Sequence, residues 1–309
     1  MFVVQYMKNK IFILGSFNVD IVSYLDDFPL PGQTIEATNS EIICGGKGAN
    51  QAYAASQNGV EVNFLTKIGK DGFAHFAKEQ LGLRIKQNNY ILETEKAATG
   101  VANIFVRGAD KENQIVINLG ANKCITEKEV QYYKSLIEES DILMVQLENN
   151  FDAIACALKL AHDANVTTLL NPAPISPQIS RLLPLVDIII PNETELQGLG
   201  KMPVSSLDET KKAVLAFSKS SGIQTIVVTR GAKGALCFQN NIFTLIPSIE
   251  NVNVVDTTGA GDAFNGALAA KLANGLNLEE AARYANFYAS LAVAGKGASN
   301  MPEGVGLLI

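Results

Sequence analysis

A short segment near the end of the chain combines small residues with a carboxylate: Asp256-Thr257-Thr258-Gly259-Ala260-Gly261-Asp262-Ala263-Phe264. It follows a β-branched run over 251–255, which predicts a strand, and leads into an alanine-rich pattern over 263–274, which predicts a helix. The first N–H groups of a helix have no acceptor within it, so such a turn can hold an anion. Asp262 stands where the helix dipole tolerates a carboxylate and where it can take a proton from a hydroxyl. This combination indicates phosphoryl transfer to an alcohol.

The same segment has two other interpretations. A strand, a glycine turn and a helix form the commonest junction in α/β proteins, and Asp at a helix start is often only a cap. The glycine pair also resembles a dinucleotide fingerprint, but Phe264 stands where the third glycine belongs. The segment also lies far from the first predicted strand and helix. A dehydrogenase is therefore disfavoured relative to a kinase.

A second segment places three glycines around a lysine: Cys44-Gly45-Gly46-Lys47-Gly48-Ala49-Asn50-Gln51-Ala52. Glycines let the backbone approach a ligand closely. The spacing is not that of a Walker loop, because Gly48 follows the lysine where Ser or Thr is needed. Lys47 and Asn50 offer donors that suit a hydroxyl-rich ligand. The alternative is a flexible turn with a solvated lysine.

The end of the first predicted strand reads Gly15-Ser16-Phe17-Asn18-Val19-Asp20. Asn18 and Asp20 share strand parity, so we expect both side chains on one face. Ligands gather at such strand ends in open α/β sheets. With the glycine segment, the pair predicts a sugar clamp, although Asn and Asp are also routine turn residues.

Three further groups follow predicted strands. Asn192 and Glu195 have the spacing of a capping box, but the carboxylate could instead organise Mg²⁺ through water. The segment Thr229-Arg230-Gly231-Ala232-Lys233-Gly234 could wrap nucleotide phosphates or be a plain turn. Glu148 is a third carboxylate on the same predicted edge.

Composition limits the function classes. The chain has 309 residues, 47% of them hydrophobic, and a formal net charge of −6. That charge argues against a nucleic-acid or anionic-membrane surface, so we expect small-molecule partners. Four widely spaced cysteines and two histidines make a zinc site improbable and favour free thiols in a reducing cytosol: Cys44, Cys124, Cys156, Cys237, His75 and His162. No Gly-x-Ser-x-Gly elbow supports a hydrolase.

The start of the chain does not resemble a secretory signal. The apolar run Met1 to Tyr6 precedes Lys8 and Lys10, the reverse of the usual charge order. No apolar run approaches the ~20 residues that a membrane span needs. We therefore expect a cytoplasmic protein, for which Met7 is an alternative start.

Strand-like and helical segments alternate over most of the chain. This predicts a three-layer α/β/α fold with a central, mainly parallel sheet, within one domain over residues 1–309. The expected strands are 11–14, 62–67, 142–146, 168–170, 188–190 and 225–229, and the expected helices are 49–58, 73–81, 127–139, 151–165, 194–199 and 207–221.

Two regions, about 19–43 and 100–119, contain strand-like runs with no helix between them. The runs cover 19–25, 34–43, 101–107 and 114–119 and predict a small antiparallel sheet. Such a sheet could close over a substrate as a lid, or be an ordinary edge hairpin.

These segments occur in the order and approximate spacing found in ribokinases. The resemblance extends from about Ile11 to Pro302 and includes Asn171-Pro172-Ala173-Pro174 and Pro191-Asn192-Glu193-Thr194-Glu195. The chain thus resembles the ribokinase-like carbohydrate kinases, and the motif from Asp256 to Phe264 is highly specific to them. The resemblance implies ATP-dependent phosphorylation of D-ribose at its 5-hydroxyl. The alternatives are a deoxyribokinase, another sugar or nucleoside kinase, or a non-catalytic sugar sensor.

The resemblance also implies roles for individual residues. Asp262 would be the catalytic base, with the N–H groups of Gly259, Ala260 and Gly261 as the anion hole. Ribose would be held by Asn18, Asp20, Gly46, Lys47, Asn50, Glu148 and Asp262. ATP would lie against Asn192, Glu195, Thr229, Arg230, Gly231, Ala232, Lys233, Gly234, Gly261 and Asn286, with Glu195 near Mg²⁺. An activating K⁺ would involve Asp256, Thr258, Ala292, Gly295 and Gly297, and the lid would form a homodimer contact.

The chain departs from the family pattern at two places. The run Ala298-Ser299-Asn300-Met301-Pro302 is about one residue shorter than usual, so the last cation ligand is unassigned. Relatives usually continue beyond Ile309 into a final helix, and we expect its absence to lower stability without affecting the chemistry.

Overall fold

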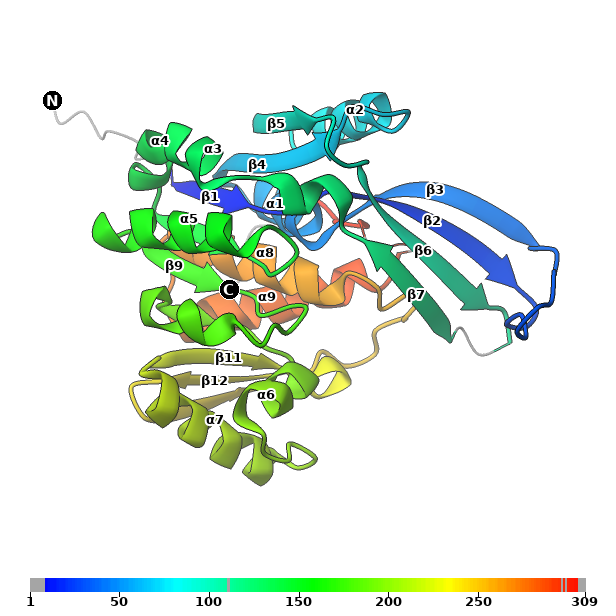
Figure 1. The fold of residues 1–309 in the computed structure, drawn as a ribbon. Helices are drawn as coiled ribbons and strands as arrows, with labels where there is room; N and C mark the ends of the chain where they lie inside the picture. Colours follow the sequence, from blue (N-terminus) through cyan, green and yellow to red (C-terminus); the bar gives the residue numbers. More distant parts are fainter. Residues whose placement is uncertain (1–8, 110–111, 296, 298, 305–309) are drawn as a thin grey trace, which may run out of the picture.

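The computed structural model describes residues 9–109, 112–295, 297 and 299–304. Figure 1 shows a large sheet covered by helices and a smaller sheet that projects beside it. Strand β1 (Lys10–Leu14) explains the layering, because its side chains alternate between the two faces. Ile11 and Ile13 pack into one hydrophobic core, whereas Phe12 and Leu14 pack into the other.

The large sheet has nine strands in the order β13-β12-β11-β10-β9-β8-β1-β4-β5. Neighbours from β11 to β5 pair in parallel, and β12 and β13 add an antiparallel edge. Besides β1, its strands are β4 (Glu61–Gly69), β5 (Asn88–Thr94), β8 (Ile142–Val145), β9 (Thr167–Leu170), β10 (Ile188–Ile189), β11 (Thr225–Thr229), β12 (Ala235–Gln239) and β13 (Ile242–Ile246). The expected central, mainly parallel sheet is confirmed.

Helices cover both faces of this sheet. One core is formed with α1 (Lys47–Gln57), α2 (Ala74–Arg84), α8 (Ala260–Ala273) and α9 (Leu278–Ala292). The other is formed with α3 (Glu127–Tyr132), α4 (Lys134–Glu138), α5 (Phe151–Asp163), α6 (Glu193–Gly200) and α7 (Leu207–Ser221). Short 3₁₀ turns complete the connections: η1 (Gly120–Cys124), η2 (Ile179–Arg181), η3 (Leu183–Leu185) and η4 (Gly231–Lys233). The three-layer α/β/α prediction is thereby confirmed.

The smaller sheet contains the four expected strand runs, in the order β3-β2-β6-β7. Its strands are β2 (Asn18–Leu25), β3 (Asn39–Gly45), β6 (Gly100–Arg107) and β7 (Asn113–Asn118). The sheet is mixed rather than purely antiparallel, because β2 and β6 pair in parallel while the outer pairs are antiparallel. The run expected over 34–43 begins as a strand only at Asn39.

Two other expectations need correction. Residues 251–255 form no strand, because Val255 and Asp256 donate their N–H groups to the Val293 carbonyl of a helix end rather than to a strand. The helix expected over 127–139 is two helices separated at Tyr133. Strands β5, β12 and β13 and helix α9 were not expected from the sequence pattern.

The carboxyl ends of the parallel strands converge on one edge of the large sheet, where α1 and α8 begin. Gly15, Gln146, Asn171 and Thr229 lie at or just after the ends of four of these strands. No helix in the described part of the chain is both long and apolar enough to cross a membrane. The alternative start at Met7 and the chain end at 307–309 lie outside the described residues.

Candidate active site

Asp262 lies in the first turn of α8. The helix begins after Gly259, whose φ of 80° lies in the left-handed region that favours glycine. The buried Asp262 carboxylate accepts hydrogen bonds from Asn50 Nδ2 at 3.1 Å and from Gln51 Nε2 at 2.8 Å. Burial raises the pKa of Asp262, and the Lys47 ammonium and the two amides offset only part of that rise. A carboxyl group with a raised pKa and a fixed orientation suits a general base.

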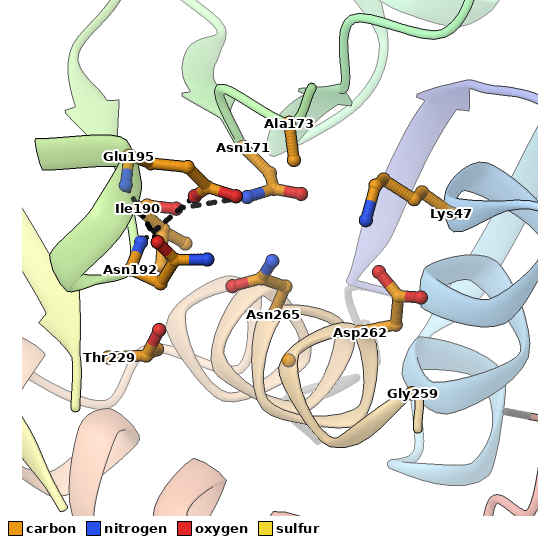
Figure 2. A pocket seen from close by; sticks show the side chains of 11 residues that line it. Lys47, Asn171, Ala173, Ile190, Asn192, Glu195, Thr229, Gly259, Asp262 and Asn265 are labelled. Atoms are coloured by element: carbon orange, nitrogen blue, oxygen red, sulfur yellow. Dashed lines mark hydrogen bonds between the residues drawn. The ribbon is translucent and has the colours of Figure 1, made fainter. Parts of the chain in front are cut away.

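Lys47 begins α1 directly after Gly46 and extends toward Asp262 (Figure 2). Its backbone N–H donates to Glu148 Oε2 at 3.1 Å, and the Ser16 hydroxyl donates to the same oxygen. Burial alone would lower the pKa of Lys47, but the carboxylates of Asp262, Glu148 and Glu195 outweigh it and raise the pKa. Lys47 therefore stays charged at the centre of an acidic cluster.

Asn18 and Asp20 start β2 and, being two residues apart in a strand, share one face as expected. Asn18 Oδ1 accepts a hydrogen bond from Asn122 Nδ2 at 2.9 Å, which leaves the Asn18 amide group to act as a donor. Burial, reinforced by the charges of Glu148 and Asp262, raises the pKa of Asp20 to about 7. Asn122 was not assigned a role from the sequence, because only the fold brings η1 to the start of β2.

A pocket opens between the starts of α8, α1 and α6 (Figure 2). Seven predicted site residues line it: Lys47, Asn192, Glu195, Thr229, Gly259, Gly261 and Asp262. Asn171, Ala173, Ile190 and Asn265 also line it and were given no site role from the sequence. Asn171 and Ala173 belong to the motif Asn171-Pro172-Ala173-Pro174, so the sequence contained a signal that could have pointed to them. Asn265 lies one helical turn after Asp262, and this spacing could have pointed to it.

Three of the predicted sugar residues outside this lining adjoin it. Asn50 contacts Asp262, Glu148 contacts the Lys47 backbone, and Gly46 is the residue before Lys47. Asp20 interacts electrostatically with Glu148 and Asp262, and Asn18 lies two residues before it on β2, but neither lines the pocket.

Asn192 and Glu195 form the capping box of α6. Asn192 Oδ1 accepts from the Glu195 N–H at 2.7 Å, and Glu195 Oε2 accepts from the Asn192 N–H at 2.9 Å. Both side chains nevertheless line the pocket, so the cap and a ligand role are compatible (Figure 2). Burial raises the pKa of Glu195. Among the described residues, the buried Asn265 Oδ1 has no hydrogen-bond partner.

Only part of the segment from Thr229 to Gly234 lines the pocket. Thr229 lines the pocket, whereas Arg230 Nε and Lys233 Nζ contact Glu193 at 3.0 and 3.4 Å. Gly231 and Ala232 are exposed in η4. Asn286 lies on α9, where its Nδ2 donates to the Pro247 carbonyl at 2.8 Å, and it is not among the pocket-lining residues.

The residues predicted to bind a monovalent cation make contacts with two side chains, Asp256 and Asn300. Its Oδ1 accepts from the Thr258 N–H at 2.9 Å and its Oδ2 from the Gly297 N–H at 3.0 Å. The Ala292 carbonyl accepts from Asn300 Nδ2 at 2.9 Å, and Gly295 packs against the same Asn300 side chain. Of the shortened run over 298–302, residue 298 lies outside the described residues.

Comparison with known proteins identifies the family of the chain. Residues 8–304 match the model of the pfkB family of carbohydrate kinases. The chain is 38% identical over 294 residues to a ribokinase of Staphylococcus aureus, covering 94% of this chain and 96% of the relative. It is 35% identical over 286 residues to a deoxyribokinase of Salmonella typhi, covering 92% of each. The structure of an Arabidopsis thaliana ribokinase complexed with ribose and ATP superposes with a TM-score of 0.87, at 30% identity over 96% of each chain.

Proposed function

Since the chain belongs to the pfkB family of carbohydrate kinases, we propose that it transfers the γ-phosphoryl group of ATP to the 5-hydroxyl of D-ribose. The observation that carries this proposal is the buried Asp262 carboxylate, held by two amides at the start of α8 and facing the pocket beside Lys47. A base at a helix N-terminus brings the proton acceptor and the anion-binding N–H groups to the same place.

In the proposed reaction Asp262 accepts the proton of the sugar hydroxyl. The hydroxyl oxygen forms a bond to the γ-phosphorus, and the bond from that phosphorus to the β–γ bridging oxygen breaks, releasing ADP. The N–H groups of Gly259, Ala260 and Gly261 stabilise charge on the transferred group. In the structure the Ala260 N–H donates to the Thr257 carbonyl at 3.2 Å, so it must turn from that partner when phosphate binds.

Asn18, Asp20, Gly46, Lys47, Asn50 and Glu148 are proposed to hold the sugar. Asp20 and Glu148 supply acceptors, and Asn18 supplies a donor because its oxygen is bound by Asn122. This set of alternating donors and acceptors suits vicinal hydroxyl groups.

We assign the nucleotide side to Asn192, Glu195 and the segment from Thr229 to Gly234, with Asn286 as the outermost contact. The pocket chemistry fits a magnesium nucleotide, because Glu195 supplies an oxygen ligand and the unpartnered Asn265 Oδ1 adds a second. Bound Mg²⁺ would neutralise developing phosphate charge. An activating K⁺ is proposed at Asp256, Thr258, Ala292, Gly295 and Gly297, where Asp256 already joins two of these segments.

The smaller sheet is proposed to act as the lid and as the contact of a homodimer. Its edge strand β7 is exposed along its whole length and includes Ile115, Val116 and Ile117. An exposed apolar edge strand favours pairing with another chain.

The experiment measures ATP-dependent ADP release with ribose, 2-deoxyribose, fructose and adenosine, each with K⁺ or Na⁺. We expect the highest kcat/KM for ribose with K⁺. In Asn18→Leu the ratio of kcat/KM for ribose over 2-deoxyribose should fall about tenfold or more, because the donor to a hydroxyl is lost. A preference of the wild type for 2-deoxyribose would instead support a deoxyribokinase, as in the Salmonella relative. Ribose binding without turnover of any acceptor would support a sensor.

A further inference from the structure

Three buried amide side chains form a chain of hydrogen bonds that ends at Asp262. Gln146 Nε2 donates to Gln51 Oε1 at 2.6 Å. Gln51 Nε2 then donates to Asp262 Oδ1 at 2.8 Å and to Asn171 Oδ1 at 3.1 Å. Gln51 and Gln146 are fully buried, and neither lines the pocket, so both can reach the reaction only through other residues.

The direction of this chain is determined where Gln51 meets Asp262 and Asn171. Asn171 Nδ2 donates to the Ile190 carbonyl at 3.0 Å, so its oxygen must face Gln51. The Asp262 carboxylate and Asn171 Oδ1 both accept hydrogen bonds, so Gln51 must present its N–H groups to them. Its Oε1 then faces Gln146, whose Nε2 donates to it. If the Gln51 amide were reversed, its oxygen would face a carboxylate and a carbonyl oxygen, with no donor between them.

We propose that Gln51, held in this orientation by Gln146 and Asn171, is a positioning residue that fixes the Asp262 carboxylate for proton transfer. The inference rests on the proposed function and adds to it a residue that does not touch the substrate. Gln51 binds Oδ1 while Asn50 binds Oδ2, so the two amides set the rotation of the carboxylate. A base held in one rotation meets the sugar hydroxyl without a further conformational search.

Other charged groups act on Asp262 from several elements, so the test must leave them unchanged. Lys47 on α1, Asp20 on β2, Glu148 after β8 and Glu195 on α6 all interact electrostatically with Asp262. Replacing Gln by Met keeps the length of the side chain, removes the donor and adds no charge.

The test compares Gln51→Met, Gln146→Met and the double variant with wild type, using kcat, KM for ribose and the pH dependence of kcat/KM. In Gln51→Met we expect kcat to fall about tenfold or more, with KM within about threefold. The acidic limb of the profile should move up by about one pH unit, because a hydrogen bond to the charged form is lost. Gln146→Met should shift kcat and the acidic limb in the same directions by smaller amounts. The double variant should have the same kcat and acidic limb as Gln51→Met.

Gln87→Met is the matched control. Gln87 bonds the backbone of Val60 and Val62 through its side chain, so the substitution also removes hydrogen bonds, but away from the pocket. It should leave kcat and the acidic limb unchanged.

Wild-type kcat and acidic limb in Gln51→Met would overturn the inference, and full additivity of the Gln146 effect would overturn the role of Gln146. If Gln51→Met does not fold, Gln146→Met is the test, and a wild-type kcat and acidic limb in that variant would overturn the inference. A wild-type protein that phosphorylates no acceptor would overturn the proposed function and this inference together, whereas the other results leave the proposed function standing.

Discussion

At the residue scale, the site concentrates carboxyl groups around one lysine. Asp20, Glu148, Glu195 and Asp262 all have raised pKa values, with burial as the largest cause. Lys47 is the cation that three of them share. Such a cluster costs folding free energy, because buried groups that prefer to be neutral are held where a ligand needs their charge.

Asp20 makes this cost measurable. Its pKa rises from 3.8 to about 7 on folding. Below about pH 4 the proton is bound in both states, and between that pH and about pH 7 the folded state keeps a proton that the unfolded state loses. The contribution of Asp20 to the unfolding free energy is therefore fully present below about pH 4, falls as pH rises from there, and is lost once pH has passed about 7. The variant Asp20→Asn has no such proton to lose. As pH rises from about 5 to about 8, its unfolding free energy should therefore increase by about 2 kcal/mol or more relative to that of wild type.

Urea unfolding at several pH values checks this expectation. Asp26→Asn is the matched control, because Asp26 is exposed in the turn after β2. Stability curves of Asp20→Asn and wild type that run parallel over the whole pH range would contradict the account.

Residues from the continuous sequence motifs meet at one pocket, whereas residues that depend on contacts between elements were not assigned from the sequence. The pocket brings together Lys47, Asp262, Glu195 and Thr229, all from recognised segments. Gln51 and Asn122 were not assigned, because their roles depend on amide partners from other elements that sequence spacing does not reveal.

At the element scale, hydrophobic alternation predicted the buried parallel strands and the helices between them. It did not predict the β12–β13 hairpin, where Gln239-Asn240-Asn241-Ile242 is a short turn between the buried strand β12 and the partly exposed strand β13. It also mistook 251–255 for a strand, because β-branched residues favour strands even where no strand is adjacent to pair with them.

The junction of β1 and α1 depends on close backbone approach at Gly48. A Cβ atom there would lie 2.3 Å from Gly15 Cα and 2.4 Å from the Ser16 nitrogen. Because backbone atoms cannot move aside cheaply, Gly48→Ala should lower the unfolding free energy by about 1–3 kcal/mol and displace Lys47, reducing kcat/KM.

Thermal or urea unfolding and steady-state kinetics measure both effects. The matched control is Gly82→Ala on α2, where a Cβ atom meets nothing within 4 Å. That change should keep kcat/KM and stabilise the protein by up to about 1 kcal/mol. Equal effects of the two substitutions would show that close packing at Gly48 is unimportant.

At the scale of the whole molecule, the two sheets expose different edges. The small sheet ends in β3 and β7, and the large sheet in β13 and β5. Val116 on β7 is 64% exposed and Ile242 on β13 is 68% exposed. If the small sheet forms the homodimer contact, Val116→Lys should weaken the dimer about tenfold or more, because it brings charge into the interface, whereas Ile242→Lys should not.

Sedimentation equilibrium across a range of protein concentrations distinguishes these outcomes. A wild-type protein that stays monomeric, or a Val116→Lys variant that dimerises like wild type, would refute the proposed interface.

The most direct test of the central claim compares Asp262→Asn with wild type in ribose phosphorylation and in ribose binding by calorimetry. Asn keeps the shape of the side chain and removes the base. We predict that kcat falls by about 10²-fold or more while the dissociation constant for ribose changes by less than about tenfold. Asp262→Asn turning over ribose at the wild-type rate would contradict the assignment of Asp262 as the base.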